Sequence, residues 1–449
     1  MDYRLKETEK ALASRCMEKA LEAGAQKVRI TLNKSCMDLI GTLNGEVDKV
    51  SHCLDRSITA SLFVDGRFGS YSINRLEESV LDDFIAEAVQ QTRMLAVDEC
   101  RDLPDPERTE KNATDGKELG LFDEGCGEMT PEKRLELALG ASIFKKVTSQ
   151  TGWKLISEEA EYSDCTFDTL VLDSQGTHCR HTETSFEYGV EMTVEDSEGG
   201  KFSGYWWDAT PMLADLGIAT CCETALKRAV AQIGPKPRRS GRYRMVVDSE
   251  CASRLVTPML NALSGYALQQ KNSFLNDALG RKIFSEGLTI MDNCRVKGQT
   301  GSRLFDSEGV QTRMVPIIDK GVVSEYFINT YMSAKMGMAP TIEDATRPKL
   351  MPWPVAGLDT AAIMRRCRNG ILVTGFNGGN SNSSTGDYSF GIEGFAFKDG
   401  RITHPVREML ITGNFIELWN HLIAVGDNAR LCMSKLIPTI AFEDVDFSG

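Results

Sequence analysis

The pattern that most constrains this chain is a run of short β-like segments joined by tight turns, which occurs twice in its first half. The first run contains Asn44-Gly45 and Asp65-Gly66, residue pairs that readily adopt the positive φ angles of two-residue hairpin turns. The second run contains Asp173-Ser174-Gln175-Gly176. A helical pattern follows each run, at 76–95 and at 210–231. Two meanders with helices predict an α+β protein built on antiparallel sheet.

The strands expected in each run are short, and turn residues separate some of them. A helix at 7–23 precedes the first run. The strand segments that the sequence predicts are 27–32, 37–43, 46–53, 57–64 and 68–73 in the first run, and 153–162, 167–173, 179–186, 190–194 and 202–207 in the second.

One hairpin sequence is nearly repeated. Gly66-Arg67-Phe68-Gly69-Ser70-Tyr71 resembles Gly200-Lys201-Phe202-Ser203-Gly204-Tyr205, 134 residues further along. This spacing is consistent with an internal duplication of a half-domain. Two unrelated hairpins with common turn chemistry are the alternative.

A domain boundary is expected at Ile233-Gly234-Pro235-Lys236-Pro237, where two prolines and a glycine interrupt both periodicities. It separates an N-terminal α+β domain, residues 1–235, from a β-rich, barrel-like domain, residues 240–449. Within the first domain, the acidic segment 98–129 is expected to form a surface loop outside the core, and Thr130-Pro131 to begin a helix.

The segment 257–275 is expected to form one helix, with Thr257 as its N-cap and Gly265 in its interior. A zinc peptidase helix needs imidazoles and a carboxylate on one face. Asn261 and Tyr266 are the side chains nearest to that role here, and neither is a usual zinc ligand. An ordinary packed helix is the alternative interpretation.

The charge of the chain limits its partners. With 51 basic and 64 acidic residues, its formal net charge is −13, which argues against general binding to nucleic acid or to an anionic membrane surface. The segment 1–10 is charged, and no apolar stretch is long enough to cross a bilayer. The 13 scattered cysteines fit reduced thiols. We therefore expect a cytoplasmic protein.

Two other patterns are candidate sites. His178 and His181 are the only close histidine pair, but residues three apart on a strand face opposite sides, so a shared metal is not expected. The glycine- and serine-rich segment 375–394 is either a hairpin of a glycine-rich barrel or a binding loop. The binding residues it would supply are Thr385, Gly386, Asp387, Tyr388 and Ser389.

Four short motifs, in this order along the chain, resemble the TldD/TldE metallopeptidase family. The resemblance is to its TldE (PmbA) branch, long labelled a modulator of DNA gyrase, and is strongest at 262–425. The motifs are Lys271-Asn272-Ser273-Phe274 before Leu279-Gly280, Phe305-Asp306-Ser307-Glu308-Gly309, Thr385-Gly386-Asp387-Tyr388-Ser389 and Ile411-Thr412-Gly413-Asn414.

The resemblance implies a missing metal site. TldD-type subunits carry an H-E-x-x-x-H helix, which falls here on Asn261, Ala262 and Tyr266, so both histidines and the glutamate are absent. The family resemblance therefore implies a zinc-free partner of a TldD-type subunit, in a heterodimer that degrades or trims unfolded and leader peptides held in extended form. Zinc is expected only in that partner, and a homodimer of the isolated chain is a further expectation.

Two rival functions remain open. The chain could be an active peptidase that uses an unrecognised cysteine or serine. It could instead be a regulator that binds DNA gyrase or DNA, although the acidic balance argues against the DNA version.

Overall fold

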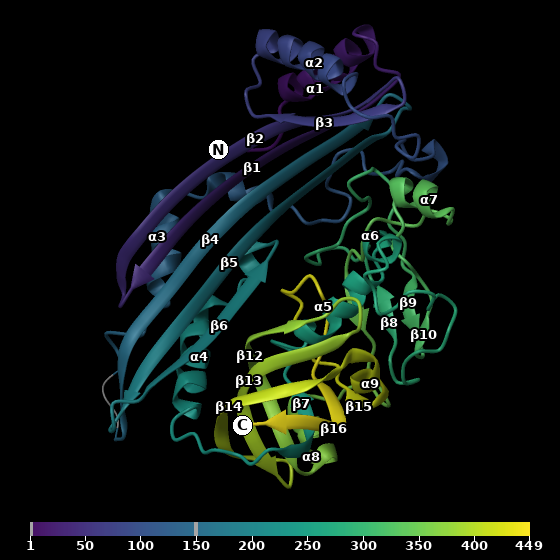
Figure 1. Ribbon diagram of the computed structural model, residues 1–449. Helices are drawn as coiled ribbons and strands as arrows, with labels where there is room; N and C mark the ends of the chain where they lie inside the picture. Colours follow the sequence, from purple (N-terminus) through teal and green to yellow (C-terminus); the bar gives the residue numbers. More distant parts are fainter. Residues whose placement is uncertain (1–2, 148–150) are drawn as a thin grey trace. The chain divides into compact units, whose positions relative to one another are not determined.

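The computed structural model describes residues 3–147 and 151–449 (Figure 1). Met1 and Asp2, which begin the charged N-terminal segment, lie outside the described residues. The chain forms two compact units, one of Met1–Ala229, Arg295–Thr312 and Asn329–Ile342, the other of Val230–Cys294, Arg313–Ile328 and Glu343–Gly449. Neither unit is contiguous along the chain, because two later segments pack with the first unit.

The first unit is built on one six-stranded antiparallel sheet in the order β3-β2-β1-β4-β5-β6. Helices pack on one face of the sheet, and Figure 1 shows α1 and α2 near one end of its long strands. The elements are α1 (Glu7–Glu22), β1 (Lys27–Leu43), β2 (Glu46–Val64), β3 (Arg67–Ile73), α2 (Glu78–Thr92), α3 (Pro131–Gly140), β4 (Trp153–Asp173), β5 (His178–Asp196), β6 (Lys201–Thr210), α4 (Cys221–Ala231) and α7 (Thr330–Met336).

The strands are about twice as long as the sequence predicts. The five segments of the first run merge into three strands, and β1 and β2 have 17 and 19 residues. The second run merges in the same way, and β4 has 21 residues. The helices are shorter than expected: α4 begins at Cys221 rather than at residue 210.

Buried ion pairs explain why the long strands look interrupted. On the helix-covered face, Lys34 of β1 lies 2.9 Å from Glu9 of α1. Arg134 of α3 lies 2.6 Å from Asp164 of β4. These polar residues are buried because each has a charged partner on a helix. They separate the apolar core under α1 and α2 from the apolar residues near α4.

The two halves of the sheet repeat one topology, in which a helix, three antiparallel strands and another helix follow in order. In each half, the helix that follows the three strands packs against a glycine of the third strand, Gly69 in β3 and Gly204 in β6. A Cβ on Gly69 would lie 2.6 Å from Oγ1 of Thr92 in α2, and one on Gly204 would lie 2.3 Å from the carbonyl oxygen of Ala225 in α4. The repeated hairpin sequence is thus one residue out of structural register, since it aligns Gly69 with Ser203.

The acidic loop at 98–129 contributes to the core, so the expectation of a purely surface segment is wrong. Ala113 is 1% exposed and packs with Cys179 of β5. The backbone of the loop also extends the sheet, because the amides of Arg180, Thr182 and Thr184 donate to the carbonyls of Ala113, Gly116 and Leu121.

The second unit contains a closed five-stranded barrel, which confirms the barrel-like expectation. Its strands follow the order β14-β13-β12-β7-β16, and a pairing of β14 with β16 closes the ring. A small sheet, β10-β9-β8-β11, lies in the same unit. The elements are β7 (Gly241–Val247), α5 (Ser253–Ala262), α6 (Gly265–Gln269), β8 (Ile290–Asp292), β9 (Pro316–Asp319), β10 (Val322–Val323), β11 (Pro348–Leu350), α8 (Thr360–Cys367), β12 (Gly370–Ser381), β13 (Asp387–Lys398), β14 (Arg401–Asn414), α9 (Phe415–Asn420), β15 (Leu422–Val425) and β16 (Ile440–Ser448).

The expected single helix at 257–275 is wrong. Helix α5 begins at Ser253, so Pro258 lies inside it and Thr257 is not its N-cap. The helix ends at Ala262, and α6 begins at Gly265. The amide of Gly265 donates to the carbonyl of Phe327 instead of continuing the helix. Among the helices of the described residues, none has the length and apolar character needed to span a membrane.

Candidate functional site

The second unit has a cavity of about 860 Å³ between α5 and the glycine-rich end of β12. Helix α5 contributes one polar face, and β12 contributes backbone that its glycines leave uncovered. The lining residues are Cys251, Ser253, Arg254, Thr257, Pro258, Asn261, Phe376, Gly378, Gly379, Asn380 and Ser381. The glycine-rich segment therefore does contribute to a cavity, through residues that precede the predicted Thr385–Ser389.

One cation dominates the electrostatics of this cavity. The Nη2 of Arg254 lies 3.4 Å from the carbonyl oxygen of Gly379, and its guanidinium lies 4.9 Å from the ring centroid of Phe390. The other polar groups that line the cavity are hydroxyls, amides and one thiol. Such a lining suits hydrogen bonding to a peptide backbone or a carboxylate.

The residues of the cavity do not fit zinc. Asn261 lines the cavity, but Ala262 is buried at 2% exposure, and Tyr266 is 49% exposed without being among the lining residues. Among the described residues that line the cavity, none is a histidine, an aspartate or a glutamate. Zinc sites in proteins are built from those residues and cysteine thiolates. The three positions of the metal motif therefore supply no usual zinc ligand here.

The predicted binding residues Thr385, Gly386, Asp387, Tyr388 and Ser389 form the turn and first residues of β13. Within this turn, Oγ1 of Thr385 donates to Asp387 at 2.6 Å. Nδ2 of Asn414 donates to the carbonyl of Thr385 at 2.8 Å and to Asp387 at 3.0 Å. The hydroxyl of Thr385 and the amide of Asn414 hold the pKa of Asp387 below its usual range. These contacts tie the turn to the end of β14.

The aromatic residue of the motif is buried in the barrel. The ring centroid of Tyr388 lies 4.9 Å from that of Phe415 and 5.5 Å from that of Phe390. Burial raises the pKa of the Tyr388 phenol, so this group stays protonated. A Cβ on Gly386 would lie 3.0 Å from the ring of Phe274. The motif thus contacts the segment after α6, strand β13 and helix α9, and the contact with Phe274 explains its glycine.

The close histidine pair, His178 and His181, lies on β5 in the first unit. On β5, His178 is exposed and His181 is buried, with its Nε2 3.2 Å from Glu183. Sequence reasoning missed a group on β1 and β2, in which ligand atoms of Cys36, Asp38 and His52 lie within 4.8 Å of one another. The strand pairing that places Asp38 opposite His52 would have revealed it. The guanidinium of Arg134 lies 3.0 Å from Asp38, and its positive charge disfavours binding of a cation by these three residues.

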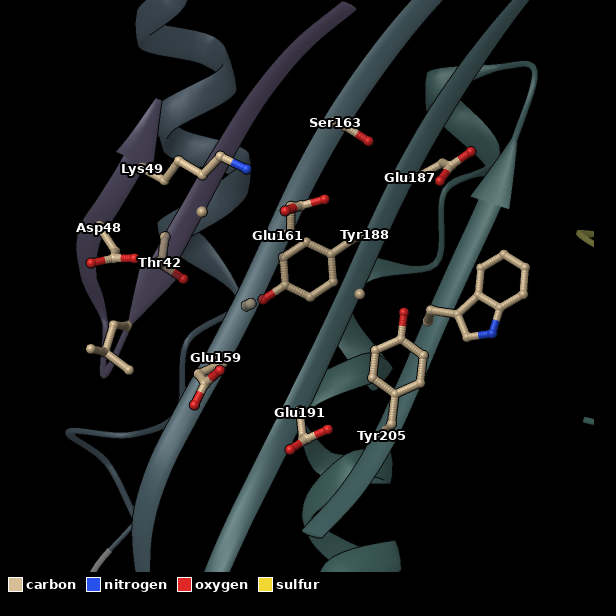
Figure 2. Close-up of a pocket in the computed structure, with 15 residues that line it drawn as sticks. Thr42, Asp48, Lys49, Glu159, Glu161, Ser163, Glu187, Tyr188, Glu191 and Tyr205 are labelled. Carbon is tan, nitrogen blue, oxygen red and sulfur yellow. The ribbon is translucent and has the colours of Figure 1, made fainter. Parts of the chain in front are cut away.

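The first unit has a second hollow, of about 620 Å³, on the sheet face away from the helices (Figure 2). The hollow forms where two glycines lack side chains. Gly41 of β1 and Gly189 of β5 are both paired with Glu161 of β4, so one row of the sheet lacks side chains on either side of this glutamate. Tyr205 of β6 covers Gly189, where an added Cβ would lie 2.6 Å from the tyrosine hydroxyl.

The lining of this hollow is strongly acidic. Figure 2 shows Glu159 and Glu161 on β4 beside Glu187 and Glu191 on β5. Glu159 and Glu191 are directly paired across the two strands. Like charges directly opposite one another destabilise a strand pair. Aromatic rings of Tyr205 and Trp207 line one side. Carboxylates and aromatic faces together favour cationic groups such as lysine and arginine side chains.

Two family models match consecutive stretches of the chain. A model described as the PmbA/TldA metallopeptidase central domain matches residues 124–233. A model described as the PmbA/TldA metallopeptidase C-terminal domain matches residues 240–449. The two matches together cover more than half of the chain, which defines a protein of the PmbA/TldA metallopeptidase class.

Individual relatives show to which branch of this class the chain belongs. The metalloprotease PmbA of Escherichia coli O157:H7 is 25% identical over 454 residues, covering 96% of this chain and 96% of its own. A Bacteroides thetaiotaomicron VPI-5482 structure, named as a modulator of DNA gyrase, is 37% identical, covers 99% of both chains and has a TM-score of 0.92. The chain therefore belongs to the TldD/TldE family, in its PmbA/TldE branch.

A more distant structure shares the fold. TldE from Thermococcus kodakarensis is 18% identical, has a TM-score of 0.84, and covers 98% of this chain and 100% of its own. At this identity the likeness supports the fold alone. The expected family and fold class are confirmed.

Proposed function

We propose that the chain is the non-hydrolytic subunit of a cytoplasmic peptidase, which acts with a metal-carrying TldD-type subunit to degrade or trim unfolded and leader peptides. One observation carries the proposal: the metal-motif positions hold Asn261, Ala262 and Tyr266, and among the described residues that line the cavity beside Asn261 none is a histidine, an aspartate or a glutamate. Hydrolysis in this account belongs to the partner, which supplies the zinc.

The cavity supports a role in holding peptide rather than cutting it. Arg254 provides one fixed positive charge, suited to a peptide carboxylate or carbonyl. Backbone at Gly378 and Gly379 is open to hydrogen bonding with an extended chain. In the proposed complex, this subunit therefore orients the substrate while the TldD-type subunit performs the reaction.

The acidic hollow of the first unit supports a preference among peptides. Four glutamates and two aromatic rings line it. In the proposed function, segments rich in lysine or arginine are retained there better than acidic segments. Peptidase assays of the complex with basic and acidic peptides of equal length test this preference, and equal values of kcat/KM would contradict it.

The test of the proposal compares three samples: this chain alone, a TldD-type subunit from the same source alone, and their mixture. Peptide cleavage and bound zinc are measured in each. The proposal predicts cleavage only in the mixture, and zinc only where the TldD-type subunit is present. Zinc-dependent cleavage by this chain alone would contradict it.

An active thiol peptidase is the rival that a specific observation favours, because Cys251 lines the cavity. Its Sγ lies 3.5 Å from the carbonyl of Asp248 and 3.6 Å from that of Val373. No histidine is among the described residues lining the cavity to act as its base. Full activity of a Cys251→Ser complex would exclude this rival. A salt-dependent titration with gyrase and DNA tests the regulatory rival that the relatives' names suggest.

A further inference from the structure

One stripe of helix α5 lines the cavity of about 860 Å³ in the second unit. The stripe consists of Arg254, Thr257, Pro258 and Asn261, which follow one another at the three- and four-residue steps that share a helix face. Arg254 and Asn261 are seven residues apart, which corresponds to about 10 Å along the helix axis. The stripe is therefore as long as about three residues of an extended peptide.

Arg254 is the one charged side chain among the described residues that line this cavity. Its guanidinium contacts the carbonyl oxygen of Gly379 and the ring of Phe390, and within the described parts of the chain it forms no ion pair with an aspartate or a glutamate. A guanidinium has five N–H donors, so most of those on Arg254 remain available to a ligand. Their planar arrangement matches the two oxygens of a carboxylate.

Neutral polar side chains of the lining are also available to a ligand. Four of them make no side-chain hydrogen bond with residues 3–147 or 151–449, namely Ser253, Asn261, Asn380 and Ser381. Hydroxyl and carboxamide groups both donate and accept hydrogen bonds. They therefore match the N–H and C=O groups of a peptide, while Arg254 matches a negative charge.

Strand β12 contributes a bulge to the same cavity. Its pairing with β13 passes from Asn377 to Asn380, so Gly378 and Gly379 have no partner residue in the ladder. The φ of Gly378 is 69°, and an added Cβ there would meet nothing within 4 Å. The backbone of a ligand can therefore come close to this bulge without meeting a side chain.

We propose that this cavity binds the C-terminal carboxylate of a peptide, which pairs with the guanidinium of Arg254. One fixed cation matches the single charge of that carboxylate, whereas phosphorylated and acidic motifs are usually held by clusters of arginines. The neutral side chains and the bulge of β12 match the peptide groups that precede the terminus. The inference rests on the proposed function, because it takes the ligand to be the peptide substrate, and it makes a free C-terminus the feature by which substrates are selected.

Calorimetry with the full chain tests the proposal with three probes. The first is an N-acetylated hexapeptide of uncharged residues with a free C-terminal carboxylate, and the second is the same peptide as its C-terminal carboxamide. The free acid should bind about fivefold more tightly at low ionic strength, and added salt should reduce this advantage. The third probe is a carboxamide peptide that ends in aspartate, which separates a side-chain carboxylate from the terminal one. It should bind no more tightly than the uncharged carboxamide.

A charge-removing substitution assigns the effect to the cavity. Arg254→Gln should weaken binding of the free acid about fivefold and leave binding of the carboxamide unchanged. Arg254 is exposed, so the fold should tolerate the change, and the melting temperature checks this. The matched control is Arg313→Gln, because Arg313 is an exposed arginine of the same unit outside the cavity lining. It should change neither affinity.

The results that would overturn the inference differ from those that would overturn the proposed function. Equal affinity for the acid and the carboxamide, an advantage of the acid that survives in Arg254→Gln, or no binding of either peptide would overturn it. Binding of the aspartate carboxamide as tight as that of the free acid would also overturn it, since the cavity would then accept any carboxylate. All four results leave the proposed function standing, because cleavage and zinc content in the separate and mixed subunits decide that proposal.

Discussion

The guanidinium of Arg134 hydrogen-bonds both carboxylate oxygens of Asp164, at 2.6 and 2.8 Å, where helix α3 packs on the central strands β1 and β4. Both residues are buried, at 8% exposure each. Asp38 lies 3.0 Å from the same guanidinium. Removing the arginine leaves the buried carboxylate of Asp164 without its cation, which is far more costly than losing an exposed ion pair.

Arg134→Ala is therefore expected to lower the free energy of unfolding by about 3–5 kcal/mol. Urea denaturation followed by circular dichroism measures the change. Lys133→Ala, at an exposed neighbour on the same helix, is the matched control and should change it by less than about 0.5 kcal/mol. Equal effects of the two substitutions would show that burial of the pair does not matter.

Gly204 is expected to tolerate no side chain. Its Cβ would lie 2.3 Å from backbone atoms of Ala225 and Ala229, so Gly204→Ala must push α4 away from β6. A loss of about 1–3 kcal/mol in unfolding free energy is expected. The control is Gly140→Ala at the end of α3, where an added Cβ meets nothing within 4 Å. A neutral result at Gly204 would contradict the close packing of α4.

Glu9 should make the first unit less stable in acid. Burial tends to raise the pKa of Glu9, but the Lys6 amide and the Lys34 ammonium outweigh burial and hold the pKa below its ordinary value. A lowered pKa stabilises the folded state above the unfolded pKa, and this contribution is lost as pH falls through the folded pKa. Stability should thus decline below about pH 4.3, the ordinary glutamate value.

Urea titrations at several pH values measure this decline. In Glu9→Gln it should be smaller than in wild type, whereas Glu18→Gln, at an exposed position of the same helix, should leave it unchanged. A decline of the same size in all three proteins would contradict the assignment to Glu9.

The acidic hollow predicts a conflict between stability and binding. Glu191→Gln removes one charge from the directly paired Glu159 and Glu191, so it should stabilise the fold by a few tenths of a kcal/mol. The same substitution should weaken binding of a lysine-rich peptide, measured by calorimetry. Glu198→Gln, in the exposed turn between β5 and β6, is the control for both effects. Tighter peptide binding by Glu191→Gln would contradict the proposed preference.

Turn chemistry was the most predictable part of the fold. The hairpin turn Asn44-Gly45 joins β1 to β2 as the sequence predicts, and Asn44 has a φ of 55°. Thr130 caps α3, and its side chain accepts from the amide of Lys133. These features depend on a few adjacent residues, so a single sequence is enough to predict them.

Strand length and helix breaks could not be predicted, because they depend on distant partners. Lys34 continues β1 only because Glu9 neutralises it in the interior. Helix α5 ends at Ala262 near a bond from Gly265 to Phe327, a residue more than sixty positions away. The cavity beside Asn261 was hidden for the same reason, since β12 follows α5 by more than a hundred residues.

The central claim is that this chain carries no zinc-dependent activity of its own and completes a partner that does. The most direct measurement is peptide cleavage, with zinc content, for this chain alone, for a TldD-type subunit from the same source alone, and for their mixture. The account predicts that cleavage appears only on mixing and that zinc stays with the TldD-type subunit. Zinc bound tightly by this chain alone, together with cleavage that a chelator abolishes, would contradict it.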